Sequence, residues 1–362
     1  MAYNKGIMTH SKLSILLFLF FYASNLVLSA EQQVEKEKKE FNAGKKIMSH
    51  IVDAYDWHIA DIGDVHISIP LPVILYDEGD WHFFWSSKFE HGYSSYKGYK
   101  IAKEGRLSGK IVRIADDGAY IRPLDFSITK NVFSIFITSA FIIWLFISIA
   151  KSYNRRRGHA PKGIQSVFEP LILFIRDDIA RDSIGEKHYR KFLPFLLTLF
   201  FFIFLNNLIG LIPFFPGGAN VTGNIGVTGV LAGFTLLTIW VNGNKNYWKH
   251  IFNTPGMPWW LKVPIPLIPI IEIVGVFTKP FVLMVRLFAN ITAGHIIILG
   301  FISLIFIFGQ NSVAGGYTIS VVSVGLAIFM NFLELLVAFI QAFVFTLLSA
   351  IFLGMAVEEE HH

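Results

Sequence analysis

The chain has 362 residues, of which 53% are hydrophobic and only 16% are charged. This composition is too apolar for a soluble globular domain, so the sequence indicates a membrane protein. There is no cysteine, which excludes disulfides, thiolate metal sites and cysteine nucleophiles. The net charge of +5 would suit nucleic-acid binding, but polytopic membrane proteins also collect Lys and Arg in cytoplasmic loops, so the positions of these residues decide.

Residues 1–30 have the pattern of a secretory signal peptide. Basic residues precede an apolar run, and Ser29 and Ala30 are small residues just before the charged Glu31. We expect cleavage near Ala30. Because Leu28 is a poor match for the third position before the cut, an uncleaved anchor is the alternative. In both cases the chain from Glu31 onward lies outside the cytoplasm.

Residues 31–128 differ from the rest because they are charged, aromatic and rich in turn residues. After a solvated charge run, short alternating runs broken by Gly, Pro and Asp predict β-strands, and hence a small β-rich extracytoplasmic domain. Its histidines raise the question of a metal site, but none is spaced with a convincing second ligand, so ordinary histidines are the favoured interpretation. They are His50, His58, His66, His82 and His91.

Residues 129–362 predict the membrane domain. The uncharged run 132–150 nearly spans the ~30 Å hydrocarbon core at about 1.5 Å per residue. Residues 151–191 then contain ten Lys or Arg against five Asp or Glu, whereas the expected loops 216–223 and 306–318 contain no charged residue. This asymmetry places 151–191 in the cytoplasm and explains the net charge as topology, so nucleic-acid binding is not expected.

Helical patterns continue to the C-terminus. Apolar residues between Phe168 and Ile179 recur at helical spacing, which predicts a helix on the inner membrane surface, with a buried packing helix as the alternative. A membrane hairpin follows over 192–215 and 224–242. The last two apolar stretches, 265–306 and 317–357, are too long for upright helices, because 40 residues span about 60 Å, so each is broken or steeply tilted.

The segment GQNSVAGG, residues 309–316, is expected to be the turn between these stretches, and Pro280 is a candidate kink. The predicted fold class is an all-α polytopic membrane protein. It has about five transmembrane helices, the last two long and steeply tilted, an interfacial helix, and the small β-rich extracytoplasmic N-terminal domain.

Five ionisable residues lie inside the last hairpin, where each costs about 2.5 to 3.5 kcal/mol at the membrane centre. They are Glu272, Lys279, Arg286, His295 and Glu334. Such residues are functional candidates by default. The alternative is snorkelling or a satisfied ion pair, which is the favoured interpretation for Lys279 alone.

Folding the hairpin about its expected turn places polar residues of the two helices at matching levels. Arg286 falls opposite Gln341, and His295 falls beside Glu334. A histidine titrates near neutral pH, and a carboxylate partner holds its orientation. Arginine suits the centre, because a pKa above ~12 keeps it charged even when it is buried.

The first helix of the hairpin carries further polar groups on one face. Asn290 lies one turn after Arg286, and Glu272 lies about 21 Å before it along the axis, toward the cytoplasm. Two polar paths thus meet at one permanent cation.

Several stretches resemble subunit a of F-type ATP synthases. FTKPFVLMVRLFANITAGHIIIL is similar to the family's arginine helix, NFLELLVAFIQAFVFTLLSAIFLGMA to its last helix, and FLNNLIGLIPF with NVTGNIGVTGVLA to the preceding hairpin. The resemblance covers about residues 129–357, and RLFAN and IQAF are its most specific parts. The signal peptide and the 31–128 insertion look like the long form found in Bacteroidota.

The resemblance implies a non-catalytic stator subunit with no cofactor, which forms two proton half-channels against the rotating c-subunit ring and couples proton translocation to ATP synthesis. It implies that Arg286 faces the ring carboxylate, with Glu272 on the inner half-channel. It assigns four residues to the outer half-channel or the rotor interface: Asn290, His295, Glu334 and Gln341. Some members carry the His and Glu of the pair interchanged. Weaker candidates on the earlier hairpin are Asn206, Asn207 and Asn224.

The implied partners are the c ring, the b-subunit peripheral stalk, the remaining ATP synthase subunits and membrane lipids. The implied location is the bacterial inner membrane, with the N-terminal domain periplasmic and the C-terminus cytoplasmic. The chain has no GxxxxGK[ST] loop for ATP. Two rival classes are a secondary transporter and a membrane metalloenzyme. Internal inverted repeats would favour the transporter and an HExxH-type pair would favour the metalloenzyme, but the sequence shows neither feature.

Overall fold

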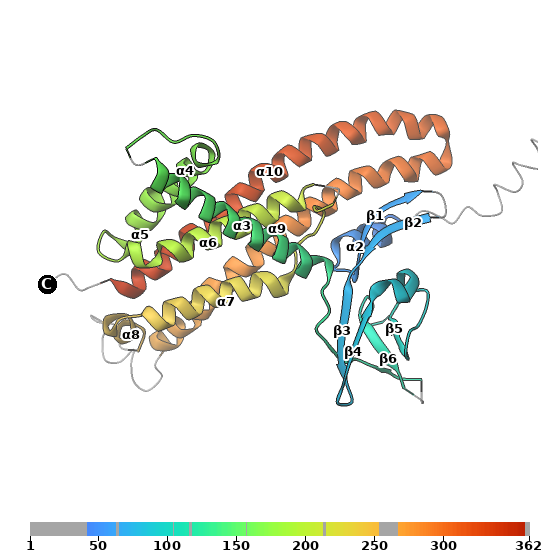
Figure 1. The fold of residues 1–362 in the computed structure, drawn as a ribbon, viewed down its shortest axis with the longest axis horizontal. Coiled ribbons are helices and arrows are strands. Elements are labelled where there is room, and N and C mark those ends of the chain that lie inside the picture. The colour runs from blue at the N-terminus through green and yellow to red at the C-terminus, as the bar shows by residue number, and fades with distance from the viewer. Residues whose placement is uncertain are drawn as a thin grey trace, which may run out of the picture.

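The structure is a computed structural model, and it describes residues 42–62, 65–103, 105–115, 118–156, 158–212, 215–252 and 267–358. The expected signal peptide lies outside the described residues. The described chain has two parts, a β-rich N-terminal part and a bundle of long helices (Figure 1).

The N-terminal part contains three small antiparallel sheets. One helix precedes them, and a short 3-10 helix follows β4. The elements are α2 (Ala43–Ile51), β1 (Asp56–Ile62), β2 (Val65–Pro70), β3 (Pro72–Asp77), β4 (Asp80–Trp85), η1 (Ser86–Gly92), β5 (Tyr99–Ile101), β6 (Ile111–Ile114), β7 (Tyr120–Ile121) and β8 (Leu124–Asp125). The sheets have the orders β1-β2, β4-β3-β8 and β5-β6-β7.

Side chains alternate between buried and less buried along β3, and the buried ones form the core of the N-terminal part. Val73 and Leu75 are fully buried and pack in one cluster with Phe89, Tyr99 and Ile111. The intervening side chains of β3 point to the other face of the sheet, as the two-residue period of a strand requires. The β3–β4 hairpin turns through Glu78 and Gly79, both at positive φ, a two-residue turn that suits the twist of antiparallel strands.

Trp57 joins the N-terminal part to the helices. It is 3% exposed and packs with Ala219 and Val221 of the loop between two membrane helices. Its ring makes edge contacts with Phe133, at 5.9 Å between centroids, and with Phe215, at 5.3 Å. The β1-β2 sheet therefore rests on one end of the helix bundle.

Five described helices are long and apolar enough to cross a membrane. They are α3 (Lys130–Arg155), α6 (Tyr189–Gly210), α7 (Ile225–Asn242), α9 (Leu267–Asn311) and α10 (Val313–Val357). Together with the small N-terminal sheets, they confirm the predicted fold class. The protein is a multi-pass membrane protein.

The segment between α3 and α6 begins with exposed apolar residues and ends with buried ones. It forms α4 (Ile164–Phe174), a π-helix η2 (Ile175–Arg181) and the short α5 (Asp182–Ile184). Ile164 and Val167 are exposed, whereas Ile175 and Ile179 are fully buried in the main core. A helix is present at the expected residues, and the burial of Ile175 and Ile179 agrees with the packing alternative for its second half. A further short helix, α8 (Lys245–Phe252), follows α7.

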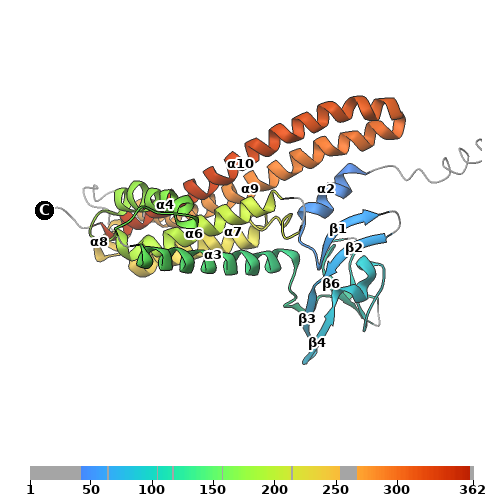
Figure 2. The same ribbon diagram turned by 45° about the horizontal axis from the view of Figure 1, so that its top comes forward.

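Helices α9 and α10 are each continuous over 45 residues, so they are tilted rather than broken. Figure 2 shows the pair running obliquely to α3. The helix continues through Pro280. The expected eight-residue turn at 309–316 is wrong in extent, since only Ser312 separates the helices: its hydroxyl accepts a hydrogen bond from the Gly315 N–H at 2.8 Å and caps α10.

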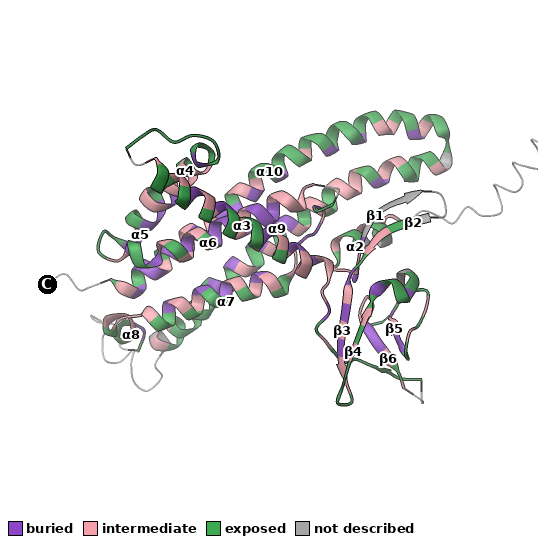
Figure 3. Ribbon diagram, viewed as in Figure 1, coloured by how far each residue is buried: buried purple, intermediate pink, exposed green. Residues whose placement is uncertain are grey.

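Burial is unequal along this hairpin (Figure 3). The half nearest the C-terminus packs on α6 and α7 and contributes Ala342, Phe345 and Leu353 to the main core. The half next to the turn, residues 296–330, is mostly exposed, although its two helices contact each other and α2 contacts α9.

Candidate functional site

A histidine and a carboxylate meet between the two long helices. His295 Nδ1 on α9 and Glu334 Oε1 on α10 form a hydrogen bond, which is an ion pair when the imidazole is protonated. Glu334 is 3% exposed, and its second oxygen has no hydrogen-bond partner among the described residues. The structure therefore brings together the two residues that the hairpin register predicted side by side, and leaves one buried acceptor oxygen available.

Gly294 makes room for this carboxylate. A Cβ at this position would lie 2.8 Å from Glu334 Oε1, closer than real Cβ atoms come to other heavy atoms. The absence of a side chain thus lets Glu334 lie against the α9 backbone beside His295. Sequence reasoning missed this glycine, because its role depends on which residue of the opposite helix faces it.

Polar groups of the α6–α7 hairpin lie next to the pair. Thr222 Oγ1 donates to Asn207 Oδ1 at 2.5 Å, and Asn207 Nδ2 donates to the carbonyl oxygen of Ala338 at 3.3 Å, one turn of α10 from Glu334. All of these side chains are buried. A hydrogen-bonded chain therefore runs from the 215–223 loop to α10. Sequence reasoning also missed Thr222, although Asn220 and Thr222 are polar residues in an uncharged loop and could have been singled out.

Gly210 brings α6 close to the same place. A Cβ built there would lie 3.1 Å from the carbonyl oxygen of Ala219 and 4.0 Å from His295 Nε2. The imidazole is thus bounded by the Glu334 carboxylate on one side and by the backbone of α6 on the other.

The two other candidate asparagines have local partners. Asn206 Nδ2 donates to the Phe202 carbonyl oxygen at 2.8 Å, while its buried Oδ1 has no partner within the described chain. Asn224 caps α7, because its side chain accepts from the Gly226 N–H at 2.9 Å. Asn207 is therefore the one of the three weaker candidates that reaches the α10 backbone.

Arg286 lies on an open face of α9. The residue is exposed, as is Asn290 one turn further on. No hydrogen bond or ion pair links its guanidinium to another described residue. Gln341 is 7% exposed and belongs to the packed side of α10. The predicted level match with Gln341 is not accompanied by a hydrogen bond.

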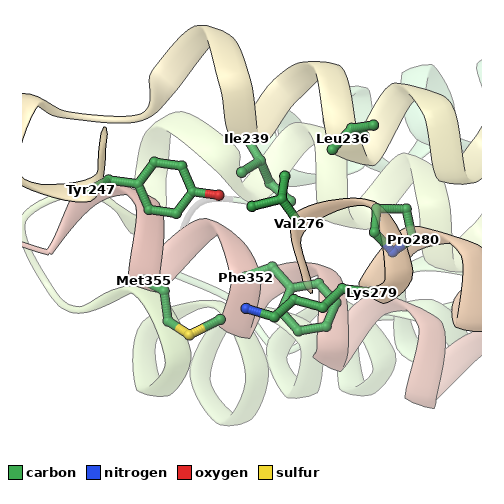
Figure 4. A pocket seen from close by; sticks show the side chains of 8 residues that line it. All are labelled: Leu236, Ile239, Tyr247, Val276, Lys279, Pro280, Phe352 and Met355. Carbon is green, nitrogen blue, oxygen red and sulfur yellow. The ribbon is translucent and has the colours of Figure 1, made fainter. Parts of the chain in front are cut away.

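The N-terminal part of α9 carries Glu272 and Lys279 near α8. Lys279 is exposed, and its Nζ lies 5.3 Å from the centre of the Phe352 ring, at the rim of a small pocket (Figure 4). Burial and, secondly, the negative charge of Glu272 raise the pKa of the Tyr247 hydroxyl. Lys279 thus has a local aromatic neighbour, and Glu272 lies close enough to Tyr247 of α8 for its charge to act on the hydroxyl. The pocket is lined by Leu236, Ile239, Tyr247, Val276, Lys279, Pro280, Phe352 and Met355.

The helices and the site together define a multi-pass membrane protein in which ionisable side chains are held between two very long helices. The sequence matches the ATP synthase A chain family over residues 132–354, and residues 46–126 match a family described as a domain of unknown function. The chain belongs to the ATP synthase A chain family, which confirms the resemblance to subunit a.

Curated relatives are consistent with this assignment. The chain is 44% identical over 245 residues to ATP synthase subunit a of Chloroherpeton thalassium, an alignment that covers 66% of this chain and 69% of the relative. It is 46% identical over 244 residues to ATP synthase subunit a 2 of Prosthecochloris aestuarii, covering 66% and 71%. For ATP synthase subunit a of an Anaeromyxobacter species the identity is 38% over 250 residues, covering 66% and 56%.

Proposed function

We propose that this chain is the proton-channel stator subunit of an F-type ATP synthase and works against a rotating ring of c subunits. The observation that carries the proposal is Arg286, a permanent cation on an exposed membrane helix with no partner among the described residues. Membership of the ATP synthase A chain family supports the same role.

The surroundings of Arg286 explain why it needs a partner. Val282 and Val285 on the same helix are 42% and 37% exposed, so apart from the uncharged Asn290 the surroundings of Arg286 on this helix are apolar. A cation at mid-membrane costs about 2.5 to 3.5 kcal/mol if it stays unpaired. A carboxylate on a neighbouring subunit would remove this cost, and guanidinium retains its proton because its pKa lies above ~12. Arg286 would then attract each ring carboxylate and bar direct passage of a proton.

The two half-channels follow from the positions of the other polar groups. On the outer side, Asn207 and Thr222 lead from the loop toward His295 and Glu334, where a buried carboxylate oxygen and an imidazole can pass a proton. On the inner side, Glu272 takes the outgoing proton. Each proton then supplies about 2.3 kcal/mol per 100 mV of membrane potential, so several cross for each ATP.

The remaining expectations belong to the same proposal. Asn290 lies on the rotor side of the hairpin, whereas Gln341, which is buried in α10, belongs to the outer half-channel. The peripheral stalk of b subunits with the other synthase subunits completes the complex. The membrane is the bacterial inner membrane, with the N-terminal domain periplasmic and the C-terminus cytoplasmic. The positive charges of 151–191 support this orientation.

The test is ATP-driven proton pumping in vesicles that contain the complete complex with Arg286→Ala. We expect assembly to be normal and pumping to be lost. Lys279→Ala is the matched control, since it also removes an exposed cation from α9 but one that already contacts Phe352. We expect this control to keep most of its pumping. Pumping at the wild-type rate in Arg286→Ala would refute the mechanism.

A further inference from the structure

One face of the β4-β3-β8 sheet is aromatic and uncovered. Trp81, Phe83 and Trp85 alternate along β4 and are 54%, 65% and 56% exposed, and Leu124 and Phe126 at β8 are 60% and 57% exposed. The Trp81 ring stacks on Phe83, at 6.0 Å between centroids, and contacts Phe126 at 5.6 Å. These five residues form one continuous surface, here called the aromatic face.

The opposite face of the same sheet forms the core. Val73 pairs with Phe84, and Leu75 pairs with His82, so these four side chains point away from the aromatic face. Phe84 packs on Phe89 of η1, and the β5-β6-β7 sheet closes the cluster. The aromatic face is therefore not the unfinished side of a core, because the sheet already has a core on its other side.

The aromatic face is turned toward the membrane helices. In both views the β3–β4 hairpin extends sideways from the end of α3, and β5 and β6 lie on its far side from the helix bundle (Figures 1 and 2). The strand that leads into α3 is part of the sheet: the Phe126 and Ile128 N–H groups donate to β3 carbonyls at 2.9 and 3.0 Å. Only three residues separate Phe126 from Lys130, where the membrane helix begins.

We propose that the aromatic face rests on the lipid headgroup region beside α3, so that the N-terminal domain is a membrane-surface platform. Tryptophan and phenylalanine side chains gather where a protein meets the boundary between headgroups and acyl chains. Continuity with α3 holds the sheet at the level of that boundary. A contiguous exposed apolar surface of this kind marks an interaction site.

The charges nearby define the lipid chemistry. Asp77 and Glu78 at the hairpin tip are paired with Arg113 at 2.8 and 2.6 Å, and the exposed Arg122, two residues before Leu124, is the basic residue nearest to β8 along the chain. One cation beside five apolar side chains makes the apolar contact the main term. The aromatic face is therefore expected to bind the membrane mainly through apolar contacts. Its binding should not require anionic lipids, and it should depend only weakly on salt.

Absence of cysteine from the sequence makes the test direct. Phe83→Cys is labelled with an environment-sensitive fluorophore in the full chain, in nanodiscs of zwitterionic lipid and in the complete complex. Tyr93→Cys is the matched control, because Tyr93 is 78% exposed and follows η1, which covers the other face of the sheet. Quenchers are iodide in the water and nitroxides near the top of the acyl chains.

We expect the Phe83 probe to lose iodide quenching and gain nitroxide quenching relative to the Tyr93 probe, equally at low and high salt. Equal iodide quenching at both sites would show that the face lies in water and would overturn the proposal. A Phe83 probe shielded from both quenchers only in the complex would assign the face to a protein partner and also overturn it. Trp81→Cys repeats the measurement if labelling at position 83 disturbs the sheet.

Discussion

The backbone of Gly294 lies against the carboxylate of Glu334, and a Cβ added at Gly294 would lie 2.8 Å from Oε1 and 2.9 Å from the carboxyl carbon. The small residue on α9 thus sets the position of a charged residue on α10. The same contact keeps Glu334 within reach of His295.

Gly294→Ala should therefore act on the pair without touching either member. The added methyl group moves the carboxylate away from the imidazole, and small misplacements at a reacting group are costly. We expect proton pumping to fall by about tenfold or more, with assembly preserved. Gly300→Ala is the control, because a Cβ there would meet no atom within 4 Å. Equal pumping in the two variants would contradict this role for Gly294.

The His295–Glu334 pair should behave as one unit. Glu334→Gln and His295→Gln each disturb this hydrogen-bonded pair, and a buried polar group left without its partner costs about 1 to 3 kcal/mol. We expect each single substitution to reduce both thermal stability and pumping. Combining the two should cost less than the sum, since coupled residues are not additive. Strict additivity would show that the two residues act separately.

Trp57 should be the main attachment of the N-terminal domain to the helices. Trp57→Ala removes a buried ring that contacts Phe133 and Phe215, a loss of about 3 to 5 kcal/mol for a core tryptophan. We expect faster hydrogen exchange in the 215–223 loop and at the start of α3, with the rest of the membrane helices unchanged. Tyr93→Ala, at an exposed position, should leave exchange at both places unaltered.

The N-terminal domain should lose stability in strong alkali. Burial, and the hydrogen bond that Tyr99 donates to Asp77 at 3.0 Å, raise the pKa of Tyr99 from 10.0 to about 12. The folded state holds this proton more tightly than the unfolded state, so the contribution is complete below pH 10 and is lost as the pH rises through about 12. Tyrosinate absorbance should show a group that ionises near pH 12 and disappears in Tyr99→Phe. Its persistence in Tyr99→Phe would assign it to another tyrosine.

The sequence predicts the membrane helices well, because an uncharged apolar run of sufficient length has few other possible structures. It also predicts the His295–Glu334 contact, because two helices joined by a short turn have a nearly fixed register. The extent of the turn was misjudged, since Gly315 and Gly316 look like turn residues but lie inside α10 once Ser312 caps it.

Other features of the site depend on packing between segments far apart in the chain. The Thr222–Asn207 contact requires the loop to fold back on α6, and the exposure of Arg286 depends on which face of α9 the other helices cover. The hydropathy of the sequence predicts neither the loop contact nor the exposed face of α9. The sheets of the N-terminal domain were predicted as a class, but their pairing order was not, because short strands give no signal for their partners.

Helix α2 touches α9, and Figures 1 and 2 show this contact on the part of the hairpin that projects beyond the other helices. Mechanically, the projecting hairpin resembles a beam with two supports, because the helix bundle holds one end and α2 contacts it further out. A beam held at one end bends far more under a sideways load than one with a second support. Contact with α2 should therefore make the hairpin stiffer against lateral force, an effect that depends on the position of α2 and not on any chemical reaction.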